Sequence, residues 1–123
     1  MSQRSAAVEH LDRTGVVHLA TTTDDGREVV TLIWAVVVDG VPYIRNGHGA
    51  ASKWYGRLTR SRAGAFLDGE TRHRVRVEHA TDETELAGVD AAYRAKYADD
   101  PDSLAFVVAP EARRHTLRVV PEG

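Results

Sequence analysis

The sequence predicts a mainly β protein, a six-stranded antiparallel β-barrel with flanking helices. The first reason is a set of three Asp-Gly pairs, at 25–26, 39–40 and 68–69, each lying between runs rich in β-branched and apolar residues. Asp-Gly supplies the positive φ angles of tight hairpin turns, so the strands on either side are antiparallel. The second reason is that such strands would leave open edges, which closure into a small barrel removes.

Six segments are expected to be strands, because apolar and β-branched residues alternate or run together in them. These strands are 16–22, 28–38, 41–46, 63–67, 71–79 and 115–120. Helices are expected where apolar residues recur at helical spacing, at 5–13, 50–60 and 82–97, with a short helix or turn at 102–108. Ser5 is placed to cap the first helix, and Gly15 follows its end.

Composition narrows the class of protein. A length of 123 residues favours a single domain over 1–123. The absence of cysteine excludes disulfides, thiolate metal ligands and cysteine nucleophiles. A net charge of -2 argues against nucleic acid as a partner, since binding it usually needs a basic face. No apolar run is long enough for a membrane span and no signal-peptide pattern opens the sequence, so a cytoplasmic protein is expected.

The histidines form no recognisable metal motif. The sequence contains His10, His18, His48, His73, His79 and His115. No two of them have the i, i+4 helical spacing used for zinc, and His73 and His79 lie too far apart along one strand to share an ion. No metal site is expected.

The strand at 28–38 is apolar on both of its faces. The interior of a small barrel covers only one face, so Trp34 or its neighbours are expected to meet a second surface. Twofold pairing of identical chains is the commonest way to supply one, and we expect a homodimer. The alternative is that the helices at 50–60 and 82–97 cover this face within one subunit.

The segment 43–55 carries the strongest signal for ligand binding. The residues in it that are expected to form the site are Arg45, Asn46, Gly47, Ser52, Lys53 and Trp54. Two cations and the backbone donors of a helix start suit an anion such as a phosphate, and glycine allows close approach of the backbone. The alternative is an ordinary connection from strand to helix with two solvated cations.

The run LATTTDDGREVVTLIWAVVVDGVPYIRNGHGAASKWYGRLTRSRAGAFLDG resembles the core of the pyridoxamine-phosphate-oxidase-like split barrels. Within it, WYGRL resembles a helix of the deazaflavin-dependent nitroreductase relatives. The whole chain, including DAAYRAKY and APEARRHTLRVVP, is similar to a bacterial family of uncharacterised proteins in this superfamily. The resemblance therefore implies an FMN-binding split-barrel fold with the cofactor between two subunits.

The resemblance also implies a cofactor and the residues that hold it. The cofactor would be FMN or an 8-hydroxy-5-deazaflavin coenzyme, and the activity that of an oxidoreductase acting on a small molecule. Thr31 and Ile33 would face the ring. The phosphate would be held by Arg45, Ser52 and Lys53, while Asn46, Gly47 and Trp54 would line the loop. The chain lacks the paired basic strand and the C-terminal segment of the oxidase itself, so pyridoxamine phosphate is not the expected substrate.

No residue is identified as catalytic by the sequence. Tyr43, His48 and Tyr55 are the candidate acids or bases in the segment 43–55, and side chains of these types commonly have a structural role. Two other functions stay open, because function depends on the site rather than on the fold. One is a barrel that carries a flavin, haem or other planar ligand without turnover. The other is a barrel that has lost its cofactor and acts as an interaction protein.

Overall fold

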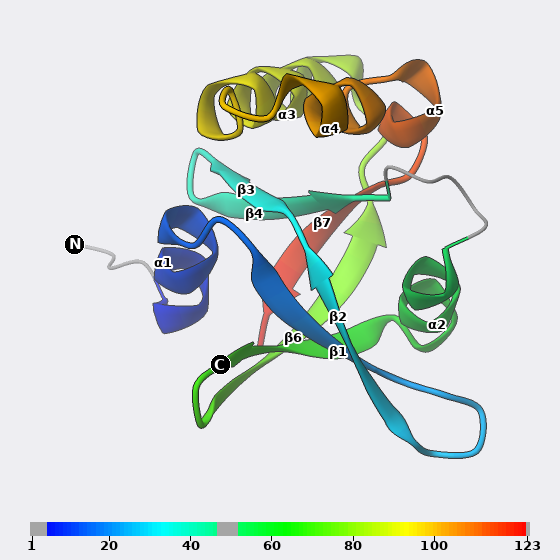
Figure 1. Ribbon diagram of the computed structural model, residues 1–123. Helices are drawn as coiled ribbons and strands as arrows, with labels where there is room; N and C mark the ends of the chain where they lie inside the picture. Colours follow the sequence, from blue (N-terminus) through cyan, green and yellow to red (C-terminus); the bar gives the residue numbers. More distant parts are fainter. Residues whose placement is uncertain (1–4, 47–51, 123) are drawn as a thin grey trace.

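The computed structural model describes residues 5–46 and 52–122, which form one curled antiparallel sheet with flanking helices (Figure 1). The strands are β1 (Val17–Thr22), β2 (Glu28–Ile33), β3 (Ala35–Val38), β4 (Val41–Arg45), β5 (Ala63–Asp68), β6 (Thr71–His79) and β7 (Thr116–Pro121). The helices are α1 (Ala6–Arg13), α2 (Lys53–Ser61), α3 (Glu83–Lys96), α4 (Pro101–Val107) and α5 (Pro110–Arg113). In the described part of the chain, no helix is both long and apolar enough to cross a membrane.

The strand order is β2-β1-β5-β6-β7-β4-β3. β2 and β3 are therefore the two edges of the sheet, although only Trp34 separates them in the sequence. The sheet has to curl for its edges to meet at one residue, and this curling gives the split barrel. The structure has seven strands rather than the six expected, because the segment 28–38 is interrupted at Trp34.

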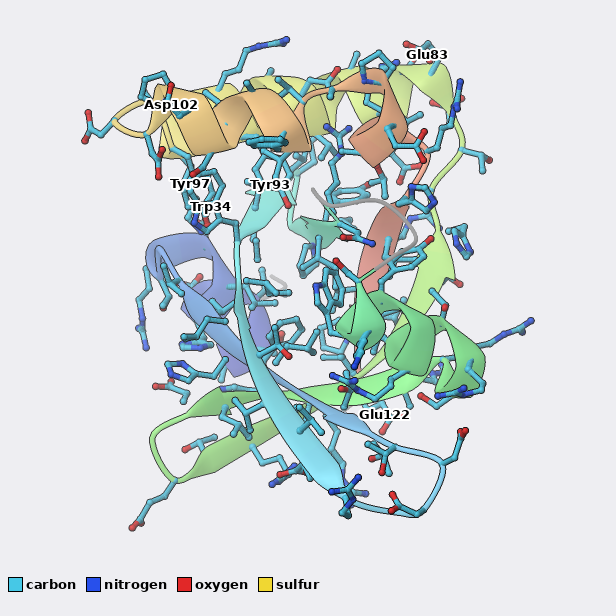
Figure 2. The ribbon with its side chains drawn as sticks, turned by 45° about the vertical axis from the view of Figure 1, so that its right-hand side comes forward. Trp34, Glu83, Tyr93, Tyr97, Asp102 and Glu122 are labelled. Carbon is cyan, nitrogen blue, oxygen red and sulfur yellow. The ribbon has the colours of Figure 1, made fainter. Side chains whose placement is uncertain are left out.

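Tyr97, the C-cap residue of α3, supplies hydrogen bonds at this interruption. The Tyr97 hydroxyl accepts a hydrogen bond from the Ala35 amide at 3.1 Å and donates to the Gly15 carbonyl at 2.6 Å. The Trp34 and Tyr97 rings stack with centroids 3.9 Å apart. Figure 2 shows Trp34, Tyr93 and Tyr97 together under α3 and α4. Burial raises the pKa of Tyr97 to about 12, so its hydroxyl stays protonated and keeps both bonds.

Two apolar clusters divide the molecule. One fills the barrel and includes Leu11 of α1 and Leu58 of α2. The other lies where α3 and α4, here called the helix layer, pack over β3 and β4. Val36 of β3 belongs to this second cluster. α3 thus covers the second face of β3 within the subunit. The outer face of β2 stays open, with Val30 46% and Leu32 60% exposed.

Local signals in the sequence place most of the elements correctly. Ser5 caps α1 by accepting a hydrogen bond from the Val8 amide at 3.2 Å, and Asp82 caps α3 in the same way. Gly26 and Gly40 have φ angles of 86° and 80°, as the predicted hairpin turns require. The short helix α5 was not expected.

Candidate functional site

A pocket of about 350 Å³, here called the α4 pocket, lies between the barrel and the helix layer. Its barrel side is formed by Leu32, Ile33, Trp34, Arg45 and Asn46. Its other side is formed by Trp54 of α2 and, at α4, by Asp100, Ser103, Phe106 and Val107. The pocket thus brings together four residues expected in the site, which come from three different elements or their ends.

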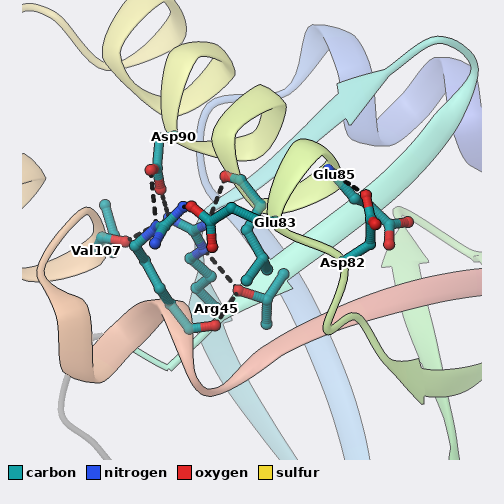
Figure 3. Close-up of polar contacts among 9 residues, drawn as sticks. Arg45, Asp82, Glu83, Glu85, Asp90 and Val107 are labelled. Carbon is teal, nitrogen blue, oxygen red and sulfur yellow. Dashed lines mark hydrogen bonds and ion pairs between the residues drawn. The ribbon is translucent and has the colours of Figure 1, made fainter.

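The Arg45 side chain is not free to hold a ligand in this pocket. It is 0% exposed, and its Nε donates to the Thr116 hydroxyl at 2.8 Å. Its Nη1 donates to the Val107 carbonyl at 3.0 Å and is ion-paired with Asp90, and its Nη2 donates to the Leu86 carbonyl at 3.1 Å (Figure 3). The structure therefore corrects the expectation that Arg45 binds a phosphate.

Arg45 instead ties strand β4 to the helix layer. Its acceptors lie on α3, α4 and β7, at positions 41 to 71 residues beyond Arg45 in the sequence. The ion pair is extended by Arg113, whose Nε lies 2.8 Å from the second Asp90 carboxylate oxygen. Val107 belongs to the wall of the α4 pocket, so the bond from Arg45 fixes the position of that wall.

Tyr43 and Tyr55, the two tyrosines of the segment 43–55, both form hydrogen bonds. The Tyr43 hydroxyl donates a hydrogen bond to Glu85. Burial raises the pKa of Tyr43, and the hydrogen bond to that carboxylate raises it further. The Tyr55 hydroxyl lies 2.9 Å from Nε2 of His79, and burial raises its pKa as well. A raised pKa keeps each phenol protonated at neutral pH. His48, the third candidate, lies outside the described residues.

Lys53 lies in a second pocket, here called the cation pocket, with a volume of about 300 Å³. It is lined by Thr23, Asp24, Lys53, Gly56, Arg57 and Arg60. Arg57 donates through Nε to the Thr21 hydroxyl at 2.7 Å, and Arg60 pairs with Asp24 at 3.2 Å. One carboxylate thus faces three cations, and the pocket has a surplus of positive charge.

Of the remaining expected residues, Thr31 and Ser52 line neither the α4 pocket nor the cation pocket. Thr31 is half-buried on β2, two positions before Ile33 and on the same face of the strand. Ser52 occupies the N-cap position of α2, where its side chain makes no capping hydrogen bond within the described residues. Gly47 lies outside the described part of the chain.

Sequence reasoning missed the α4 side of the α4 pocket and, apart from Lys53, the residues that line the cation pocket. Lys53, Arg57 and Arg60 follow i, i+4, i+7 spacing and so share one helix face, a signal that was available. Ser103 and Phe106 carry no comparable signal. They are far from the segment 43–55 in the sequence, and only the tertiary fold brings them beside it.

No group of three or more histidine, aspartate or glutamate side chains within residues 5–46 and 52–122 is arranged to hold a metal ion. His10 and His73 stack at 5.7 Å near Asp68, which lies 3.4 Å from Nδ1 of His10. Nearly parallel rings direct their nitrogens along separate planes, so this pair is not arranged as a chelating site.

The fold is a split barrel, as in a putative pyridoxamine 5′-phosphate oxidase of solved structure. Residues 7–119 match the family described as an uncharacterized protein conserved in bacteria (DUF2255), and the chain belongs to that family. No curated protein matches the chain.

Several solved structures share the fold. The conserved hypothetical protein Rv2991 from Mycobacterium tuberculosis is 21% identical, with a TM-score of 0.69 over 100% of this chain and 82% of that one. An F420 reductase is 19% identical, with a TM-score of 0.56 over 100% and 97% of the two chains. A putative pyridoxamine 5′-phosphate oxidase from Listeria innocua is 12% identical, with a TM-score of 0.61 over 95% and 91%.

Proteins named for other ligands are also similar. A haem-binding protein from Mycobacterium smegmatis is 18% identical, with a TM-score of 0.63 over 98% of this chain and 52% of that one. A FAD-binding protein from Mesorhizobium loti is 19% identical, with a TM-score of 0.59 over 97% and 91%. At these identities the likeness shows the fold alone.

Proposed function

We propose that this protein binds a phosphate-bearing flavin-type cofactor, FMN or an 8-hydroxy-5-deazaflavin coenzyme, and acts through it as an oxidoreductase on a small molecule. The observation that carries the proposal is the pair of pockets on either side of the first turn of α2. Lys53 lies in the cation pocket, and Trp54, the next residue, lies in the α4 pocket. A ligand with an anionic end and a flat apolar end needs these two environments close together.

The chemistry of the two pockets fits such a cofactor. Lys53 and Arg57 would hold the phosphate as charge-assisted donors, with the hydroxyl of Ser52 and the start of α2 beside them. Thr31 and Ile33 would face the ring from β2, and Asn46, Gly47 and Trp54 would line its other side. Arg45 takes no part in this site, since its donors are bound by the protein.

The cofactor would supply the electron chemistry, and this chain would supply binding, orientation and exclusion of water. Ile33 and Trp54 are buried apolar side chains in the α4 pocket, so they would shield one part of the ring from solvent. Thr31 is the half-buried polar group on the same face of β2, so its hydroxyl would be the donor or acceptor for a ring edge.

Binding without turnover is the second candidate. Haem- and FAD-binding proteins share the fold, and Tyr43 and Tyr55 are both held as protonated phenols by burial. A barrel of this kind would bind a flavin yet fail to transfer electrons. The two functions are separated by asking whether the bound flavin, once reduced, is reoxidised by an added acceptor faster than free flavin.

The test is a fluorescence titration of the protein with FMN and, separately, with a deazaflavin coenzyme. We expect saturable binding of one of them well below about 1 mM, the weak end of the usual scale. Absence of saturable binding of both would refute the cofactor and leave an interaction protein as the remaining function.

We also propose a homodimer. The outer face of β2 exposes Val30 and Leu32, and the covering by α3 stops at β3. The covering explanation therefore accounts for half of the segment 28–38, and a second subunit would account for the other half. Light scattering at micromolar concentration should give the mass of two chains, and the mass of one chain would exclude the dimer.

A further inference from the structure

The α4 pocket is more aromatic than a cofactor phosphate site requires. Trp34, Trp54 and Phe106 all line it, and the Phe106 side chain is 58% exposed at its margin. Large apolar side chains are usually buried, and an exposed one beside a concave apolar surface is typical of a ligand site. The flat faces of these rings favour a planar ligand.

The charges around this pocket are unsuited to an anion. Arg45 is the one cationic residue among its described lining residues, and Asp90 and three other acceptors of the protein occupy the guanidinium. The other charged lining residue is Asp100, whose carboxylate accepts a hydrogen bond from the Ser103 amide at 3.1 Å. An anionic ligand would lie near this exposed carboxylate, with no free cation among the described lining residues to compensate the repulsion.

The α4 side of the pocket is held in a fixed position. Arg45 donates to the Val107 carbonyl at the end of α4, and Asp100 caps the start of the same helix. Phe106 is the neighbour of Val107, where α4 is attached to β4 through Arg45. A wall held at this point loses little conformational freedom when a ligand binds, which favours affinity.

From these observations we propose that the part of the α4 pocket between Trp34 and Phe106 binds an uncharged, planar, apolar molecule as the second reactant, beside the cofactor ring at Ile33 and Trp54, and that Phe106 determines the affinity for it. That this molecule is a reactant rests on the proposed function. Its chemical class rests on the residues that line the pocket.

The test uses two probes of the same shape and different charge, 2-naphthamide and 2-naphthoate, titrated into the full-length protein by fluorescence. We expect the neutral amide to bind at least about tenfold more tightly than the carboxylate, because the carboxylate would lie near Asp100 without a free cation to compensate it. Phe106→Ala should weaken amide binding by about five- to tenfold through loss of one aromatic contact. Phe106→Tyr should keep it, which separates a ring contact from a folding defect.

Val16→Ala is the matched control, since Val16 is a comparably exposed apolar residue that does not line the pocket, and it should leave both probes unaffected. Equal affinity for the two probes, or amide binding that is insensitive to Phe106→Ala, would overturn the inference. A protein that binds the amide through Phe106 and fails to bind either flavin would refute the cofactor and still support the ligand class. A protein that binds flavin and not the amide would overturn this inference alone.

Discussion

Replacing Arg45 by alanine should strongly destabilise the protein. The guanidinium is fully buried and bonds to Thr116, Leu86, Val107 and Asp90. The substitution leaves two carbonyls and a hydroxyl without their donor, and it leaves the carboxylate with one cation instead of two.

The magnitude follows from the loss of one partner of a buried ion pair. Such a loss costs about 3–5 kcal/mol, because the remaining charge and acceptors stay desolvated. Arg113 lies 2.8 Å from Asp90 and compensates part of the charge, so a value near the lower end, about 3 kcal/mol, is expected. Small domains have total stabilities of about 5–15 kcal/mol, so the variant should remain folded with a lower midpoint. Arg45→Lys should recover only part of the loss, since one ammonium cannot reach acceptors on three elements.

Urea denaturation followed by tryptophan fluorescence measures this loss. Arg27→Ala is the matched control, because Arg27 pairs with Asp25 at 3.1 Å on the exposed hairpin turn and should contribute little. The reasoning would be refuted by an Arg45→Ala variant that loses no more stability than Arg27→Ala. Such a result would mean that water, rather than these buried acceptors, bonds the Arg45 guanidinium. The side chain would then be accessible to solvent.

Two further predictions concern stability. Gly64→Ala should destabilise by about 1–3 kcal/mol, since a Cβ there would lie 2.9 Å from Leu58 Cδ1 and 3.0 Å from the Ala20 carbonyl; an unchanged thermal midpoint would contradict this. Burial lowers the pKa of His10 below 6.5, against the opposing effect of Asp68, so its contribution to stability is complete above pH 6.5 and is lost as the pH falls through the lowered value. His10→Gln should therefore flatten the decline in unfolding free energy on the acid side of neutrality, and an unaltered decline would exclude His10 as its source.

Much of the fold could be predicted because its signals are local. Turn glycines, capping residues and alternating strands are read over a few positions, and the strands and long helices lie where these signals place them. The break at Trp34 could not be predicted, because the hydroxyl that satisfies Ala35 belongs to Tyr97, 62 positions away. Without that partner, the apolar segment 28–38 has the sequence of one continuous strand.

The candidate site could be predicted only in part. Ile33, Asn46 and Trp54 were named from the sequence, and the fold brings them from three elements or their ends to the lining of the α4 pocket. Arg45 looked like a phosphate ligand because an arginine at a strand end usually reaches solvent. The acceptors that bury it come from α3, α4 and β7, and nothing in the neighbouring sequence announces them.

The central claim is that a phosphate-bearing flavin is held at the cation pocket. The most direct measurement compares the affinity for FMN, or for the deazaflavin coenzyme, of the wild type with those of Lys53→Ala and Arg74→Ala. Lys53 lines the cation pocket, whereas Arg74 lies on the exposed face of β6 outside it. The account predicts that Lys53→Ala weakens binding by about tenfold and that Arg74→Ala leaves it nearly unchanged. Equal effects of the two substitutions would contradict it, because the anion would then be held elsewhere or by general charge alone.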